Sequence, residues 1–119
     1  MGIAMTCIFC KIVAGEIPAK KVYEDEKILE FHDLYPKAPV HVLVIPKEHI
    51  ESLAHLLPEH QDIIAHLTLK LQGIAEGLGL HDGFRIGINT GKGGGQEVFH
   101  LHYHLLGQPK LEASGMHKN

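Results

Sequence analysis

Residues 99–107 read Phe-His-Leu-His-Tyr-His-Leu-Leu-Gly, and this stretch decides the fold. In an extended strand, successive side chains point to opposite faces, so residues two positions apart lie roughly 7 Å from each other on one face. His100, His102 and His104 therefore share one face of the predicted strand. The residues that alternate with them can be buried on the other face: Phe99, Leu101, Tyr103 and Leu105.

A row of three imidazoles favours two kinds of chemistry. Neutral imidazoles bind metal ions, and one imidazole can act as the nucleophile in phosphate transfer. Three neighbouring imidazoles cannot all become charged easily, so we expect their titrations to be coupled. The remaining alternative is a solvent-exposed strand with incidental histidines, and the strict alternation argues against it.

The composition predicts one globular domain over residues 1–119, with residues 1–5 as a disordered extension and 108–119 as a C-terminal tail. Hydrophobic residues make up 45% and charged residues 21%, and 11 histidines are the anomaly. A formal net charge of −3 argues against a nucleic-acid polymer or an anionic membrane as the main partner. No apolar run is long enough to span a membrane and no secretory signal is visible, so we expect a cytoplasmic protein with reduced thiols.

Hydrophobic periodicity predicts the α+β class. A long helix is expected from Pro58 to Gly77, with a shorter helical turn at 48–57 before it. The last two strands have no helix between them, so we expect them to pair antiparallel. The predicted strands cover residues 22–24, 28–32, 41–45, 84–89 and 99–107.

A glycine-rich connection, residues 91–95, leads directly into the histidine strand. It is not a P-loop, because no Gly-Lys-Ser/Thr opens a following helix. Its bare backbone N–H groups are candidates to receive a phosphate, and Asn89 can add an amide donor. A flexible hairpin is the alternative.

Cys7 and Cys10 form a CxxC motif, which is typical of redox sites or metal sites and also occurs by accident. A thioredoxin-like site needs a helix that opens at the motif, and we do not expect one here. Two thiolates and two distant histidines make a tetrahedral zinc site, with His49 and one histidine of the row as candidates. Ordinary reduced thiols are the alternative.

Taken together, these motifs resemble the histidine triad (HIT) family, and most closely its Hint branch. The resemblance covers nearly the whole chain. Its matching segments are Ile8-Phe9, Lys11-Ile12, Glu16-Ile17-Pro18-Ala19, Phe31-His32-Asp33, Ala38-Pro39 with His41, Val44-Ile45-Pro46-Lys47, Gly94-Gly95-Gln96 and residues 100–106.

The resemblance implies a homodimer whose subunits have a five-stranded antiparallel sheet with one long and one short helix. It implies hydrolysis of purine nucleoside 5′-phosphoramidates or related nucleoside monophosphate conjugates, through a nucleotidyl-histidine intermediate. His102 matches the nucleophile, and the supporting histidines are His104, His41 and His100. Asp33 matches the ribose ligand. The other residues of the implied nucleotide site are Phe9, Ile12, Phe31, His32, Leu34, Asn89, Gly95, Gln96 and Glu97.

Two features depart from the family pattern. Glu97 stands where some members have a Ser beside the leaving group, and the tail after Leu106 lacks Trp. The cysteine pair is similar to a zinc site of some bacterial relatives, which His49 and His100 would complete. Such a zinc is expected to be structural, and catalysis on a mononucleotide phosphate is expected to need no cofactor.

Two other functions stay open at this point. In one, the chain is a metal-dependent hydrolase with the histidine row as ligands. In the other, it is a regulatory protein that binds purine nucleotides without turnover.

Overall fold

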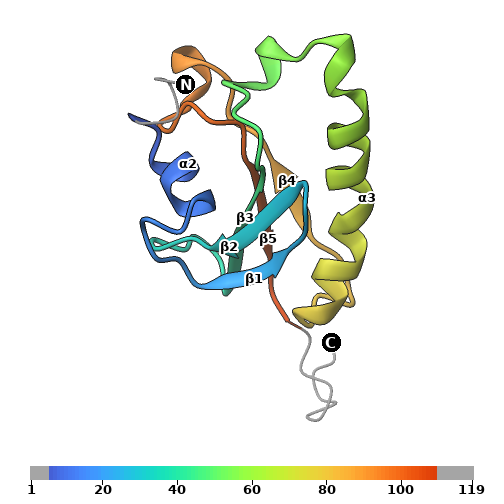
Figure 1. The fold of residues 1–119 in the computed structure, drawn as a ribbon. Helices are drawn as coiled ribbons and strands as arrows, with labels where there is room; N and C mark the ends of the chain where they lie inside the picture. The colour runs from blue at the N-terminus through green and yellow to red at the C-terminus, as the bar shows by residue number, and fades with distance from the viewer. Residues whose placement is uncertain (1–5, 110–119) are drawn as a thin grey trace, which may run out of the picture.

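A five-stranded antiparallel sheet forms the centre of the molecule in a computed structural model that describes residues 6–109 (Figure 1). The strand order is β1-β2-β3-β5-β4, so β3 is central and β1 and β4 are the edges. The five strands are β1 Lys21–Glu24, β2 Ile28–His32, β3 Val40–Pro46, β4 Arg85–Gly87 and β5 Tyr103–Gly107. The predicted α+β fold and the antiparallel pairing of the last two strands are confirmed.

One helix lies against each face of the sheet (Figure 1). Helix α3, Gln61–Gly77, covers a core that includes Val42, Val44, Tyr103 and Leu105. The short helix α2, Ile8–Val13, covers the opposite face. There the buried residues are Phe9, Ile12, Leu29, Phe31, Leu43 and Ile45. Alternate residues of β2 and β3 thus supply two separate cores.

The helical turn predicted at 48–57 is present only as a short 3-10 turn, and the short α-helix lies elsewhere. Residues 48–57 contain only the 3-10 turn Leu53–His55, and Pro58 begins a second 3-10 turn, Pro58–His60, before α3. Helix α2 instead opens at the CxxC motif, where the thiol of Cys7 accepts a hydrogen bond from the backbone N–H of Cys10 at 3.3 Å. Six residues make fewer than two turns, so hydrophobic periodicity could not reveal this helix.

The final strand is shorter than predicted. Its ladder with β3 ends at the pair Val44↔Tyr103, so His100 and His102 lie in irregular chain before β5. Strand β4 likewise spans three residues instead of the predicted 84–89. The predicted extension at 1–5 and most of the predicted tail at 108–119 lie outside the described residues.

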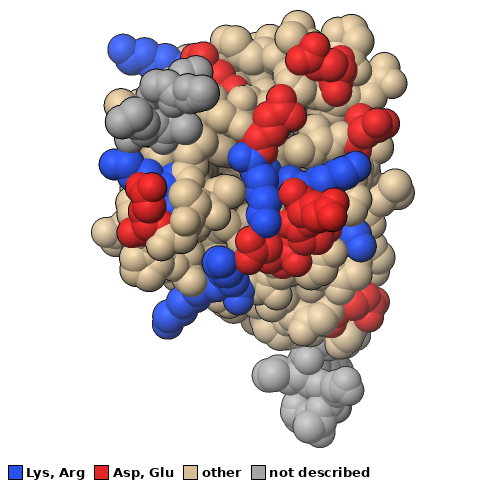
Figure 2. Space-filling model, in the orientation of Figure 1, with Lys and Arg blue, Asp and Glu red and all other residues tan. Residues whose placement is uncertain are grey.

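Acidic and basic side chains are intermixed on the face of the molecule that Figure 2 displays. Within residues 6–109, no helix has the length and apolar character needed to cross a membrane.

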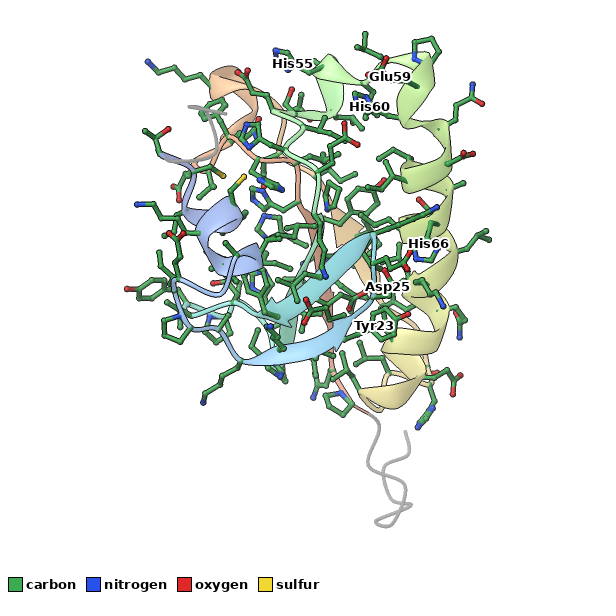
Figure 3. All side chains as sticks on the ribbon, in the orientation of Figure 1. Tyr23, Asp25, His55, Glu59, His60 and His66 are labelled. Carbon is green, nitrogen blue, oxygen red and sulfur yellow. The ribbon has the colours of Figure 1, made fainter. Side chains whose placement is uncertain are left out.

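Glu30 is the anomaly of the α3-side core. Its side chain is fully buried, and neither carboxylate oxygen has a hydrogen-bond partner among the described residues. Burial raises the pKa of Glu30 to about 8, and the negative charge of Asp25 adds to the rise. Asp25 itself is well paired: the Tyr23 hydroxyl donates to it at 2.8 Å, and His66 of α3 lies 2.7 Å from the same oxygen (Figure 3).

We predict that Glu30→Gln removes a decline in stability between about pH 4.5 and 8. The unfolded carboxyl titrates near 4.5 and the folded one near 8, so the folded state binds the extra proton in this window and loses stability as the pH rises. Urea unfolding should show the variant more stable than wild type at pH 8, by on the order of a few kcal/mol, and similar at pH 5. Glu26→Gln, an exposed neighbour, is the control; identical pH profiles for wild type and Glu30→Gln would refute the assignment.

Candidate functional site

Three histidines meet on the α2 side of the sheet. His41 of β3 lies beside His104 of β5, with Nε2 of the first 2.9 Å from Nδ1 of the second. The ring centroids of His102 and His104 are 5.0 Å apart. The Phe9 ring of α2 packs edge to face with His102, with 5.2 Å between the two ring centroids. The strand of His41 therefore lies beside the strand that carries His104.

Backbone groups fix the tautomers of His41 and His104. The N–H of Lys37 donates to Nδ1 of His41 at 3.0 Å, so a neutral His41 carries its proton on Nε2. That Nε2–H faces Nδ1 of His104, which leaves the proton of a neutral His104 on its own Nε2. The hydrogen bonds thus run in one direction from the backbone to Nε2 of His104.

His102 has the opposite tautomer. Its Nδ1 lies 2.7 Å from the carbonyl oxygen of His100, and a carbonyl only accepts, so Nδ1 carries the proton. Nε2 of His102 is left with a lone pair. Among the three rings of this site, His102 therefore has the nitrogen best prepared to attack an electrophile.

Burial keeps these imidazoles neutral. It lowers the pKa of His102 and His41 and, with the nearby His102 and His41 rings, lowers that of His104 to about 4. Desolvation penalises the charged form of each ring. Neutral rings do not repel one another, and the Nε2 lone pair of His102 remains available at neutral pH.

Asp33 lies next to this group. One carboxylate oxygen is 3.4 Å from Nε2 of His41, and the other accepts the N–H of Tyr35 at 2.8 Å. The negative charge partly offsets the lowering of the His41 pKa by burial. The predicted ribose ligand is thus within reach of anything bound at His104.

The structure brings together only some of the apolar residues of the predicted nucleotide site. Phe9, Ile12 and Phe31 pack in one cluster, with the Phe9 and Phe31 rings edge to face at 5.5 Å. Leu34 stands outside that cluster and is 82% exposed. The structure does not bring His32 to the site either, because it follows Phe31 on β2 and points to the other face, where it lines a cavity of about 510 Å³ beside α3.

The glycine-rich loop differs from expectation. The N–H groups of Gly94, Gly95 and Gln96 bond to carbonyls inside the loop, so they are not the bare donors predicted for a phosphate. The Gln96 side chain accepts from Gly91 N–H and donates to the carbonyls of Glu51 and Val98, which makes it a brace of the loop. These bonds close the loop into a 3-10 turn.

Asn89 and Glu97 were also predicted to belong to the nucleotide site. The Asn89 amide donates to the Gly94 carbonyl at 2.9 Å. Glu97 is exposed and lines a cavity of about 670 Å³ next to Cys7 and His49. Asn89 therefore supports the glycine-rich loop, and Glu97 lies toward the cysteine side of the molecule.

A second cluster gathers the predicted zinc ligands. The ligand atoms of Cys7, Cys10, His49 and His100 all lie within 4.8 Å of one another. Nδ1 of His100 is 3.3 Å from the Cys7 sulfur, and Nδ1 of His49 is 3.3 Å from the Cys10 sulfur. Burial, followed by the contact with Cys7, raises the pKa of the Cys10 thiol to about 11.

The orientation of His100 suits this cluster. Its Nε2–H donates to the carbonyl of Pro46 at 2.8 Å, which leaves the Nδ1 lone pair facing the thiols. Metal-bound histidines commonly donate their second N–H to such a carbonyl. Two sulfurs and two nitrogens are a closed tetrahedral zinc set, so the residues present fit a structural zinc.

Sequence reasoning missed the backbone groups that prepare both clusters. They are the N–H of Lys37 and the carbonyls of Pro46 and His100. Every residue has such groups, so no sequence signal marks them.

Comparisons with known proteins agree over most of the chain. A family model described as Scavenger mRNA decapping enzyme C-term binding matches residues 6–119. Protein HitA of Neisseria gonorrhoeae is 59% identical over 103 residues, which cover 87% of this chain and 96% of HitA. A solved HIT family hydrolase from Legionella pneumophila is 43% identical with a TM-score of 0.84, covering 88% of this chain and 95% of that one. A solved zinc-bound histidine triad family protein from Mycobacterium smegmatis is 42% identical with a TM-score of 0.73, covering 87% and 75%.

We predict about one zinc ion per chain in protein purified without chelators, measured by elemental analysis. His49→Ala should lose most of the metal because it removes one of four ligands, whereas His81→Ala, at an exposed histidine outside the cluster, should keep it. Absence of metal from the wild type, with both thiols titratable in the folded protein, would discard the site.

Proposed function

Because the chain belongs to the histidine triad family, we propose that it is a Hint-branch nucleotide hydrolase that cleaves purine nucleoside 5′-phosphoramidates or related nucleoside monophosphate conjugates. The observation that carries this proposal is the tautomer of His102, whose Nε2 lone pair is free while Nδ1–H is held by a backbone carbonyl. The similarity to a HIT family hydrolase supports the same class of activity.

In the first step of the proposed reaction, Nε2 of His102 attacks phosphorus. The N–P bond to His102 forms as the P–N bond to the amine breaks, and the bonding electrons go to the leaving nitrogen. That nitrogen takes a proton from Nε2 of His104. Because anionic substrate bound beside His104 raises its pKa, the ring can carry the extra proton in the complex.

In the second step, water attacks the nucleotidyl-histidine. The bond between His102 and phosphorus breaks, its electrons return to Nε2, and the nucleoside monophosphate leaves. His104, which gave up a proton in the first step, takes one from the water. The hydrogen bond from His41 holds the His104 ring while that ring is neutral at Nδ1. When His104 carries the extra proton on Nδ1, the Nε2–H of His41 can donate instead to Asp33, whose carboxylate oxygen lies 3.4 Å away.

The geometry argues against the metal-dependent alternative in which the histidine row holds one ion. Both nitrogens of His100 are directed elsewhere, Nδ1 to the thiols and Nε2 to Pro46. Only a measurement of turnover distinguishes the proposed hydrolase from a regulatory protein that binds purine nucleotides.

We propose that the ligand is a purine nucleoside monophosphate or its phosphoramidate and that the protein is cytoplasmic. We also propose that the chain forms a symmetric homodimer. Strand β4 has a free edge in the described chain, and a second copy can pair with it across a two-fold axis. Sedimentation as a monomer at micromolar concentration would contradict the dimer.

We predict that His102→Ala lowers phosphoramidase turnover by at least about 1,000-fold, as expected for loss of a covalent nucleophile. Steady-state hydrolysis of adenosine and guanosine phosphoramidates measures the effect, and calorimetry with the monophosphates should show that binding persists. His81→Ala is the matched control. Turnover at the wild-type rate in His102→Ala would show that another group is the nucleophile, and an inactive wild type that binds nucleotide would favour the regulatory alternative.

We predict that Asp33→Ala weakens ribonucleotide binding by roughly 1–3 kcal/mol, the range for hydrogen bonds to a charged group. Asp33 also lies beside His41, so a comparison ligand is needed to isolate the ribose contact. Calorimetry with a 2′,3′-dideoxynucleotide should show little change. Equal losses for the two ligands would place the effect of Asp33 on the histidines and not on the ribose.

A further inference from the structure

His100 belongs to both clusters described above. Its ring lies among Cys7, Cys10 and His49, and its backbone carbonyl accepts the Nδ1–H of His102. His100 therefore links the thiol cluster directly to the ring of His102, which has the free Nε2 lone pair.

The carbonyl of His100 has little support from the sheet. The ladder between β3 and β5 begins only at Tyr103, three residues later. In the irregular segment before it, the Leu101 N–H bonds to the carbonyl of Ile50 at 2.7 Å, and the His100 ring bonds to Pro46. The Leu101 N–H and the His100 carbonyl belong to one planar peptide, so this carbonyl is held by the bond to Ile50 and by the His100 side chain together.

Helix α2 contacts both histidines from the same side. Phe9 packs edge to face on His100 at 5.9 Å and on His102 at 5.2 Å. Cys10 follows on the same helix, and Cys7 caps it. The cysteine pair and the Phe9 ring that packs on both histidines thus belong to one six-residue helix and its N-cap.

We propose that the cluster of Cys7, Cys10, His49 and His100 positions the His102 nucleophile through the backbone of His100. A bound zinc ion would hold the His100 ring at Nδ1 while Pro46 holds it at Nε2. Together with the bond from the Leu101 N–H to Ile50, the fixed ring sets the carbonyl that selects the Nδ1–H tautomer of His102. His100 and the three other ligands are then positioning residues for the transfer step.

This inference rests on the proposed function and changes one expectation drawn from the sequence. A purely structural zinc predicts that its loss lowers the melting temperature and leaves the hydrolytic step intact. Coupling through His100 predicts that the same loss also lowers kcat, with little change in nucleotide affinity, because the groups that bind nucleotide are not rearranged.

The kinetic test compares zinc-loaded wild type, Cys10→Ser and Leu71→Ala, at a temperature where circular dichroism shows each to be folded. Cys10→Ser should lower kcat by about 10- to 100-fold, the usual effect of losing a positioning partner, with the Kd for the monophosphate within about twofold. Leu71→Ala destabilises the α3-side core and should lower the melting temperature while kcat stays near wild type. An unchanged kcat in metal-free Cys10→Ser would overturn the proposal.

The second arm does not depend on turnover or on the folding of a variant. Wild type labelled with ¹⁵N-histidine is studied by NMR before and after chelation, and His102 is assigned by comparison with His102→Ala. Chelation should abolish the Nδ1–H signature of His102, and one equivalent of zinc should restore it. A signature that survives metal removal would overturn the proposal even if the wild type hydrolyses phosphoramidates, whereas an inactive wild type with a zinc-dependent signature would defeat the proposed function alone.

Discussion

The antiparallel pairing of β3 with β5 is the constraint on which the rest of the structure depends. It sets Leu43 opposite His104 and His41 opposite Leu106, so the two imidazoles become diagonal neighbours on one face. The same pairing sends Tyr103 and Leu105 into the core beneath α3. A slip of one residue would bury the imidazoles against α3 and expose the apolar side chains, so the hydrophobic pattern holds the histidines in register.

Desolvation gives these histidines their chemical character. Buried rings resist protonation, and each must find hydrogen-bond partners inside the protein. Here the partners of His41, His102 and His100 include backbone groups, which cannot change their own protonation. The backbone therefore assigns which nitrogen carries a proton, and burial keeps the second nitrogen free.

Glu30 shows the same desolvation without such partners. It lies on β2 next to Phe31, but its carboxyl points into the α3-side core and finds no donor among the described residues. The proposed reaction does not use it, and nothing in the structure explains why a carboxyl stands there. The nearby Asp25 is the opposite case. Burial alone would raise the Asp25 pKa, but hydrogen bonds from His66 and from the N–H groups of Lys27 and Ile28 outweigh it and lower the pKa.

Sequence by itself determined the sheet, the long helix and the residues that meet at the two clusters. Strict alternation over residues 99–107 and helical spacing after Pro58 are strong periodic signals, so α3 and the two-faced strands followed from them. The CxxC spacing indicated Cys7, Cys10 and His49 as zinc ligands. Family resemblance added His41 and identified His100 as the fourth ligand, and the tertiary structure brings these residues together. Helix α2 was too short to show a hydrophobic period. The resemblance placed both Phe31 and His32 in the site, although adjacent residues of the predicted strand 28–32 point to opposite faces.

Only the tertiary structure decided what each of these groups can do. In the folded chain, the N–H groups of Gly94, Gly95 and Gln96 donate to carbonyls within the loop. The His100 ring faces the thiols, and the lone pair of His102 is on Nε2. Those outcomes depend on the carbonyls of Pro46 and His100 and on the N–H of Lys37. Backbone groups are chemically the same at every position, so their effect on a side chain appears only when the chain has folded around it.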